Sequence, residues 1–209
     1  MDINSEGSME QSILDVAEKL FLEKGFAATS TTQIAKEVGC NQALVHYYFR
    51  TKDNLFNRIF EKKFGDFFQV IFDTNQLAQL SFSQKIRHIC ESHFDLLNEN
   101  PKIPLLILNE LSRRPEHIAL LREKLHVLPE KLFEMMEKDM QAEIKAGRIR
   151  NVSFMDVVIT MVSLNVSLFT LLPVASQALK IDDEQQNAML AYRRNENVEI
   201  ILKYLQPWF

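Results

Sequence analysis

Residues 30–50 contain two short amphipathic segments separated by one glycine, and this arrangement limits the possible fold more than any other feature of the chain. Ser30, with Gln33 three residues later, forms the capping-box pattern that begins a helix. Gly39 can adopt the positive φ that ends a helix and turns the chain. Asn41 is a favoured N-cap for the next helix. The pattern predicts two short helices joined by a tight turn.

The second short helix has an apolar face and a face of hydrogen-bonding or small side chains. The apolar positions are Leu44, Val45, Tyr48 and Phe49, and the other face carries Gln42, Ala43, His46 and Tyr47. Glutamine can bond adenine edges, a small residue lets the backbone approach the bases, and Tyr and His can bond phosphate oxygens. The two segments are typical of a DNA-reading helix-turn-helix.

Helices are expected on both sides of this pair. A capping box at Ser8 and Gln11 predicts a preceding helix that ends at Gly25, with an apolar stripe that includes Ile13, Ala17, Leu20 and Phe21. A following helix begins at residues 51–52. Lys52 lies where the positive helix end and its own charge can attract a phosphate.

The whole chain is expected to be all-α, with about nine helices. It has 46% hydrophobic residues, five glycines and six prolines, a composition that favours long helices over turn-rich β architecture. After the helix-turn-helix segment, capping and proline signals predict helices over 52–80, 81–100, 101–114, 115–147 with a break near Pro129, 154–173 and 182–205. The net charge of −4 gives no global nucleic-acid signature, although residues 36–63 hold six Lys and Arg against three Asp and Glu.

Four segments carry a resemblance to a known family. Residues 13–21 (ILDVAEKLF), 24–26 (KGF), 29–39 (TSTTQIAKEVG) and 48–55 (YFRTKDNL) together resemble the DNA-binding domain of the tetracycline-repressor (TetR) family. The resemblance covers roughly residues 10–60. Cys40, Ala43 and His46 depart from the residues that are common in the family, and the last two lie on the expected DNA face, so the operator sequence is not carried over.

The resemblance implies both an organisation and a function. Residues 1–8 would be a flexible tail, 9–54 the helix-turn-helix DNA-binding domain, and 55–209 a helical ligand-binding and dimerisation domain. The function implied is a sequence-specific transcriptional regulator, and we expect a repressor that a small apolar or amphipathic ligand releases from its operator. Recognition helices of a homodimer about 34 Å apart imply a palindromic site. A three-helix unit that contacts a protein partner is the alternative.

The resemblance also assigns roles to individual residues. Base contacts are expected from Thr31, Thr32, Gln42, Ala43 and Tyr47, and phosphate contacts from Ser30, His46, Tyr48 and Lys52. Tyr48 also fits the domain core, and Thr31 and Thr32 equally suit a helix start.

Residues 157–179 contain no charged side chain, and this uncharged segment is long enough for a membrane span. Eight polar or proline positions within them and the lack of a flanking basic cluster argue against a membrane segment. We expect this helix and the last one, through Ile200, Ile201, Tyr204 and Leu205, to form half of a four-helix dimer interface. A monomeric core is the alternative.

A ligand pocket among the later helices is a further expectation, because such sites are mostly apolar with a few polar anchors. The candidate lining is Phe67, Phe94, Asn109, Phe133, Met136, Met140, Met161, Asn165 and Phe169. Phenylalanine and methionine at helical spacing equally suit a core.

We expect no enzyme, cofactor or metal site. Glycine-rich phosphate loops and nucleophile elbows are absent from the sequence. The single Glu123-x-x-His126 cannot build a di-metal centre, which needs two such motifs. Two cysteines without a pairing pattern, Cys40 and Cys90, together with a polar first segment, predict a cytoplasmic location.

Overall fold

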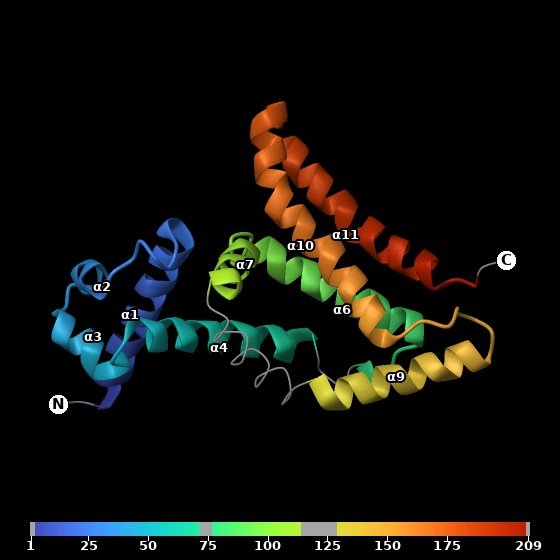
Figure 1. Ribbon diagram of the computed structural model, residues 1–209, viewed down its shortest axis with the longest axis horizontal. Coiled ribbons are helices and arrows are strands. Elements are labelled where there is room, and N and C mark those ends of the chain that lie inside the picture. The colour runs from blue at the N-terminus through green and yellow to red at the C-terminus, as the bar shows by residue number, and fades with distance from the viewer. Residues whose placement is uncertain (1–2, 72–76, 114–128, 208–209) are drawn as a thin grey trace. The chain divides into compact units, whose positions relative to one another are not determined.

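The computed structural model describes residues 3–71, 77–113 and 129–207, and these form nine α-helices and no strand (Figure 1). The chain divides into two compact units, Met1–Asp66 with Leu106–Pro115, and Phe67–Leu105 with Glu116–Phe209. The all-α expectation is confirmed. The functional division into parts 9–54 and 55–209 stays a prediction, because compactness does not report function.

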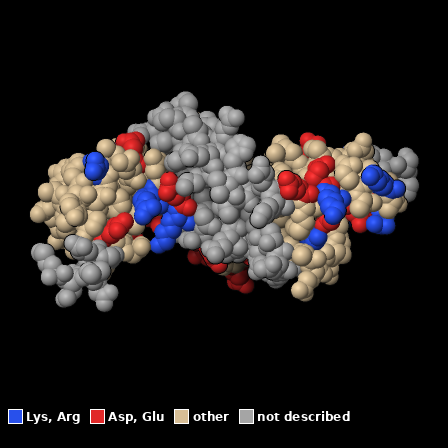
Figure 2. Space-filling view, turned by 90° about the horizontal axis from the view of Figure 1, so that it is seen from below, with Lys and Arg blue, Asp and Glu red and all other residues tan. Residues whose placement is uncertain are grey.

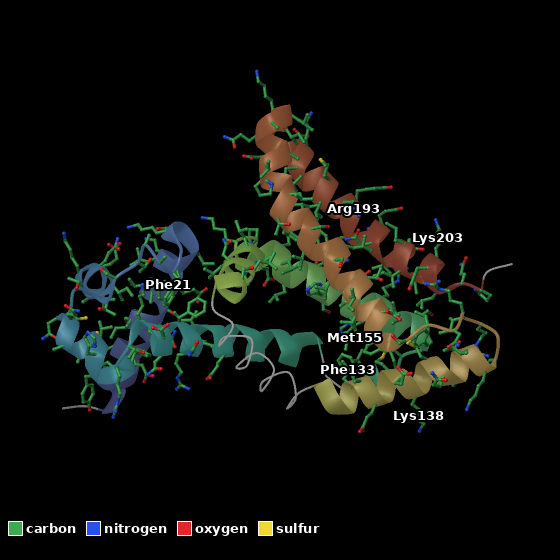
Figure 3. All side chains as sticks on the ribbon, viewed as in Figure 1. Phe21, Phe133, Lys138, Met155, Arg193 and Lys203 are labelled. Carbon is green, nitrogen blue, oxygen red and sulfur yellow. The ribbon has the colours of Figure 1, made fainter. Side chains whose placement is uncertain are left out.

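The first unit contains the three helices expected for the helix-turn-helix domain. They are α1 (Ile3–Lys24), α2 (Thr31–Val38) and α3 (Gln42–Phe49), followed by the start of α4 (Lys52–Ile71). Its core is formed by Ile13, Ala17, Leu20, Phe21, Phe26, Ile34, Ala35, Val45, Phe49, Leu55, Phe56 and Ile59. Phe21, labelled in Figure 3, lies 5.3 Å from the Phe26 ring and 5.6 Å from the Phe56 ring, measured between centroids. The apolar stripes read from the sequence are the faces that meet here.

The start of α1 differs from the expectation. The helix begins by Ile3, so residues 3–8 are helical and do not form a loose tail, and the Ser8–Gln11 capping box is wrong. The Ser12 hydroxyl donates to the Ser8 carbonyl oxygen at 2.8 Å, and Gln11 donates to Asp15 at 2.6 Å. Both bonds join residues four apart, the spacing expected within a continuing helix.

The second unit is built on α6 (Phe82–Glu99), α10 (Phe154–Leu179) and α11 (Asp183–Leu205), with α9 (Pro129–Lys145) against α6 and α10 (Figure 1). The capping box at Ser81 and Gln84 is confirmed, and Asp182 with Gln185 forms another. The helix α7 (Ile103–Arg113) lies between Asn100 and the part of the chain that is not described. Most of the helix predicted over 115–147 before Pro129 lies outside the described residues, so the expected break near Pro129 stays a prediction.

Two helix ends lie elsewhere than expected. The helix predicted over 52–80 is described only to Ile71, and residues 78–80 form a turn. The helix predicted to end near Pro173 continues to Leu179, because proline removes only one backbone donor and the rest of the ladder persists. It ends at Lys180, which takes the left-handed conformation at φ 55°.

Ion pairs join α6 to α11 along their length. Arg194 donates two bonds to the Asp95 carboxylate, at 2.6 and 2.7 Å, and lies 3.5 Å from Glu91. Arg87 bridges the same Glu91 at 3.4 Å and Glu199 at 2.5 Å. Since the partners on α6 are four residues apart, they share one helix face and fix the register of α11.

The helix α10 is long and apolar enough to cross a membrane by length and composition alone, a property that buried helices of other proteins share. One stripe of it is buried in the second unit, comprising Phe154, Val157, Met161, Asn165, Phe169 and Leu172. The opposite side exposes apolar residues instead of charges. Two of the residues expected at the dimer interface, Ile201 and Leu205, are instead buried in the core of their own chain. That part of the interface assignment is wrong.

The capping box at Ser81 gives a prediction about stability. Ser81→Ala removes the acceptor for the Gln84 backbone N–H, and we expect it to lower the free energy of unfolding by about 1 kcal/mol. Urea unfolding followed by circular dichroism measures the change. Ser83→Ala, two residues further on and exposed, is the control. Its hydroxyl lies 3.4 Å from that of Ser81 but does not cap the helix, so we expect it to change the free energy of unfolding by less than half as much. Equal effects of the two variants would contradict the capping role.

Candidate nucleic-acid interface

The turn between α2 and α3 sets the direction of the candidate reading helix. Gly39 adopts φ 81° and ψ 26°, and its N–H donates to the Lys36 carbonyl at 3.3 Å while the Cys40 N–H donates to Ala35 at 2.9 Å. Asn41 then caps α3 by accepting the Leu44 N–H at 2.8 Å. The caps predicted at Ser30, Gly39 and Asn41 are confirmed, although of the capping box predicted at Ser30 only the bond from the Gln33 N–H to the Ser30 hydroxyl is seen. The helix α3 therefore leaves the turn at one defined angle.

The expected base-reading residues lie mostly on exposed surface. Thr32, Gln42, Ala43 and Tyr47 are exposed and Thr31 is partly buried, while Val45 and Phe49 hold the other side of α3 in the core. Tyr47 exposes 73% of its side chain, and its ring packs edge-on against Tyr48 with centroids 5.3 Å apart. A large apolar ring left this open suits a surface that another molecule covers. The base contacts themselves stay predictions.

Side chains along the exposed edge of α3 are joined by hydrogen bonds. The Gln42 Nε2 donates to Thr31 Oγ1 at 3.1 Å and lies 3.4 Å from His46 Nε2. His46 Nδ1 lies 2.8 Å from the Arg50 carbonyl oxygen. Both ring nitrogens of His46 are therefore engaged within the protein, and its expected phosphate contact would require one of these bonds to break. The i, i+4 spacing of Gln42, His46 and Arg50 was the signal that could have revealed this chain of bonds from sequence.

Lys52 has a structural role that the sequence did not reveal. Its ammonium donates to the carbonyl oxygens of Phe26 and Thr29, at 2.9 and 2.8 Å, and lies 4.2 Å from the centre of the Phe26 ring. These contacts tie the start of α4 to the loop between α1 and α2. A phosphate contact by Lys52 stays a prediction, for which one ammonium donor remains. Ser30 is exposed and caps α2, and Tyr48 is half-buried. Their phosphate contacts stay predictions.

The charge of the surface is mixed. On the face drawn in Figure 2, Lys and Arg alternate with Asp and Glu, and the described atoms show no single basic patch on that face. Electrostatic attraction to DNA depends on the contacting face and not on the net charge of the chain. The geometry of the reading helix, and not bulk charge, carries the functional assignment.

The candidate pocket residues are distributed over two clusters. Phe133, Met136, Met140 and Met161 belong to the core of α6, α9, α10 and α11, while Phe94 and Phe169 pack edge-on in a separate cluster with ring centroids 5.1 Å apart. Asn109 is exposed in the first unit and does not join them. The side chain of Phe67 lies outside the described residues. Contact of any of these residues with a ligand stays a prediction.

A buried polar cluster crosses the centre of the second unit. Asn165 Nδ2 donates to the Cys90 carbonyl at 3.1 Å and to His93 Nδ1 at 3.0 Å, while Asn197 Nδ2 donates to Asn165 Oδ1 at 2.8 Å. Asn197 Oδ1 is buried with no hydrogen-bond partner among the described residues. An orphaned acceptor of this kind is costly in an apolar core unless a donor reaches it.

Burial shifts the acid–base behaviour of two members of this cluster. It lowers the pKa of His93 from 6.5 to about 4, because the charged imidazolium is poorly solvated there. It also raises the pKa of the Cys90 thiol to about 11, against the smaller opposing effect of the bond from Asn165. His93 is therefore neutral and Cys90 a protonated, unreactive thiol at neutral pH.

Comparison with known proteins agrees with this geometry. Residues 13–59 match the family described as "Bacterial regulatory proteins, tetR family". The chain is 22% identical over 138 residues to the fatty acid metabolism regulator protein of Bacillus subtilis, covering 66% of this chain and 69% of that protein. It is 27% identical over 111 residues to the biofilm operon icaADBC negative transcriptional regulator IcaR of Staphylococcus aureus, covering 53% of this chain and 58% of the relative.

The fold has a counterpart among solved structures. The transcriptional regulator FadR from Bacillus subtilis, in complex with stearoyl-CoA, superposes with a TM-score of 0.66 at 18% identity, over 94% of this chain and 99% of that one. The chain thus has a helix-turn-helix DNA-binding domain, and residues 13–59 of that domain match the tetR family of bacterial regulatory proteins. The resemblance stated from the sequence is confirmed.

The low pKa of His93 predicts acid sensitivity. Between pH 6.5 and about 4 the unfolded chain binds a proton that the folded chain excludes, so the stabilisation is present above pH 6.5 and is lost as the pH falls toward 4. We expect His93 to lower the free energy of unfolding by about 3 kcal/mol as the pH falls from 7 to 4. Urea unfolding across that range for the wild type and His93→Gln measures it. The variant should lose much less stability, whereas an unchanged pH dependence would contradict the assignment.

Proposed function

We propose that this protein is a homodimeric, sequence-specific DNA-binding repressor that leaves its operator when a small apolar or amphipathic molecule binds its second unit. The observation that carries the proposal is α3, a short helix whose exposed edge bears Gln42, Ala43 and Tyr47 directly after a fixed left-handed turn. A helix presented in this way fits the major groove. A regulator that acts on chromosomal DNA works in the cytoplasm, in agreement with the expected location.

A homodimer is supported by the apolar surface of the last two helices. Met155, Ile159, Val162, Leu171, Val174 and Leu179 of α10 are exposed, together with Met189 and Tyr192 of α11. Ile159 exposes 57% of its side chain and Val174 67%. An apolar helix face of this length without a partner among the residues that the structure describes favours a subunit interface. Two copies of α3 related by a twofold axis would read a palindromic operator.

The core of the second unit is the argument for a ligand of mixed polarity. This core contains Met136, Met140 and Met161, whose flexible side chains can adapt to a ligand. Asn197 offers a buried acceptor without a partner among the described residues. The similar Bacillus subtilis structure holds stearoyl-CoA, and the relative is described as a regulator of fatty acid metabolism. We therefore place long-chain acyl compounds first among the molecules to test.

Release requires the ligand to prefer the state that does not bind DNA, since equal affinity for both states shifts nothing. The helix α4 is the candidate lever, because its Lys52 end belongs to the first unit and its Ile71 end to the second. A small tilt of α4 would change the separation of the two reading helices. They would then no longer fit successive grooves.

A selection experiment tests the function. Purified protein is incubated with a random duplex pool, bound sequences are amplified, and affinity is measured by fluorescence anisotropy with and without stearoyl-CoA. We expect a twofold-symmetric sequence, salt-dependent binding, and weaker binding with the ligand. Stearic acid and free coenzyme A separate the acyl chain from the nucleotide. Failure to enrich any sequence would contradict DNA reading, and enrichment that none of the three compounds affects would contradict the acyl effector.

A charge on the exposed face of α10 tests the dimer. We expect Ile159→Glu and Val174→Glu to convert the dimer to monomer, because each places a carboxylate in an apolar interface. Analytical ultracentrifugation measures the state, and anisotropy should show operator affinity falling by at least tenfold. Ala142→Glu, at an exposed position on α9, is the control and should leave both unchanged. A wild-type chain that stays monomeric at high concentration would contradict the proposal.

A further inference from the structure

The hydrogen bonds along α3 fix which chemical group Gln42 presents to DNA. The chain of bonds starts at the Arg50 carbonyl oxygen, 2.8 Å from His46 Nδ1. It continues from His46 Nε2 to Gln42 Nε2 at 3.4 Å and ends at Thr31 Oγ1, 3.1 Å from the same nitrogen. Four residues from two helices and the following turn thus take part.

The direction of the two bonds made by His46 follows from the Arg50 carbonyl group. A carbonyl oxygen only accepts, so His46 Nδ1 carries the hydrogen and donates to Arg50. A neutral imidazole with its hydrogen on Nδ1 has an acceptor at Nε2. The atom of Gln42 that faces His46 Nε2 must therefore be the amide nitrogen, in agreement with its bond to Thr31.

The backbone holds the starting point of this chain in place. Arg50 adopts φ 60° and ψ −48°, a conformation that L side chains rarely take, and its N–H donates to the His46 carbonyl at 2.9 Å. Arg50 and His46 are joined through the backbone and through the ring. At the other end, the Asn41 cap fixes the first turn of α3, where Gln42 lies. The geometry is prepared before DNA arrives.

These bonds leave Gln42 with one polar group for contact with DNA, its side-chain carbonyl oxygen. Both amide hydrogens are used, one by Thr31 and one by His46, and the carbonyl oxygen Oε1 remains available. An unconstrained glutamine pairs with adenine through two bonds, accepting from N6 and donating to N7. Gln42 cannot donate to a base without losing one of its internal bonds.

We propose that Gln42 acts as an acceptor-only reader that selects an exocyclic amino group, on adenine or cytosine, over guanine and thymine. Guanine offers only acceptors in the major groove, and thymine offers an acceptor and a methyl group. His46 and Thr31 are positioning residues that hold the amide in this orientation. The inference rests on the proposed function and specifies how its reading helix chooses bases.

Sequence selection with defined variants tests the inference. In the wild type, one position in each half-site should favour adenine and cytosine over guanine and thymine by roughly tenfold, and Gln42→Ala should remove that preference. His46→Phe frees one amide hydrogen, so the preference should narrow to adenine, with cytosine falling severalfold behind. Thr31→Val frees the other hydrogen and should have the same result.

His46→Gln is the matched control, because its side-chain oxygen can accept from Gln42 in place of the imidazole. It should restore the preference for both amino bases, which a purely structural role of His46 would not predict. Circular dichroism confirms that each variant is folded. A wild-type preference for guanine or thymine at the Gln42-dependent position would overturn the inference, and so would a preference for adenine alone that His46→Phe leaves unchanged. The absence of any sequence preference would instead contradict the proposed function.

Discussion

The left-handed turn at Gly39 is the constraint on which the rest of the first unit depends. It ends α2 with backbone bonds from Gly39 and Cys40, and two residues after Gly39 the Asn41 cap starts α3. A side chain with a Cβ at φ 81° would be strained whatever the space around it. Because α3 is only eight residues long, its direction comes from this turn and from the burial of Val45 and Phe49. Without the turn, the exposed edge of α3 would have no fixed direction.

The first unit uses its polar residues to hold its own geometry as well as to meet a partner. Lys52 ties α4 to the loop after α1, and His46 ties Gln42 to the Arg50 carbonyl. A reader that is ordered in advance loses less conformational entropy on binding. The same ordering narrows what Gln42 can recognise. Selectivity and rigidity therefore have a common cause in this helix.

The second unit combines an apolar core with a small buried polar cluster. Asn165 satisfies its amide within the protein, whereas Asn197 keeps one acceptor without a partner among the described residues. Helices α6 and α11 are also locked in register by Arg194 and its carboxylate partners. Directional bonds of this kind specify one arrangement of helices that apolar contacts alone would leave degenerate. A ligand that reaches the cluster would act on the contact between these helices.

The sequence by itself determined the helices, most of their caps and the DNA-binding domain, because capping boxes, glycine turns and apolar periodicity are local signals between residues a few positions apart. It failed at Ser8, where a capping pattern lies inside a longer helix, and at Ile201 and Leu205, where an apolar stripe faces the protein's own core. Only the tertiary structure decided which apolar face stays exposed and that Thr31, on another helix, takes one amide hydrogen of Gln42. Those properties depend on contacts between residues far apart in the chain or on different helices, and periodicity alone cannot specify such contacts.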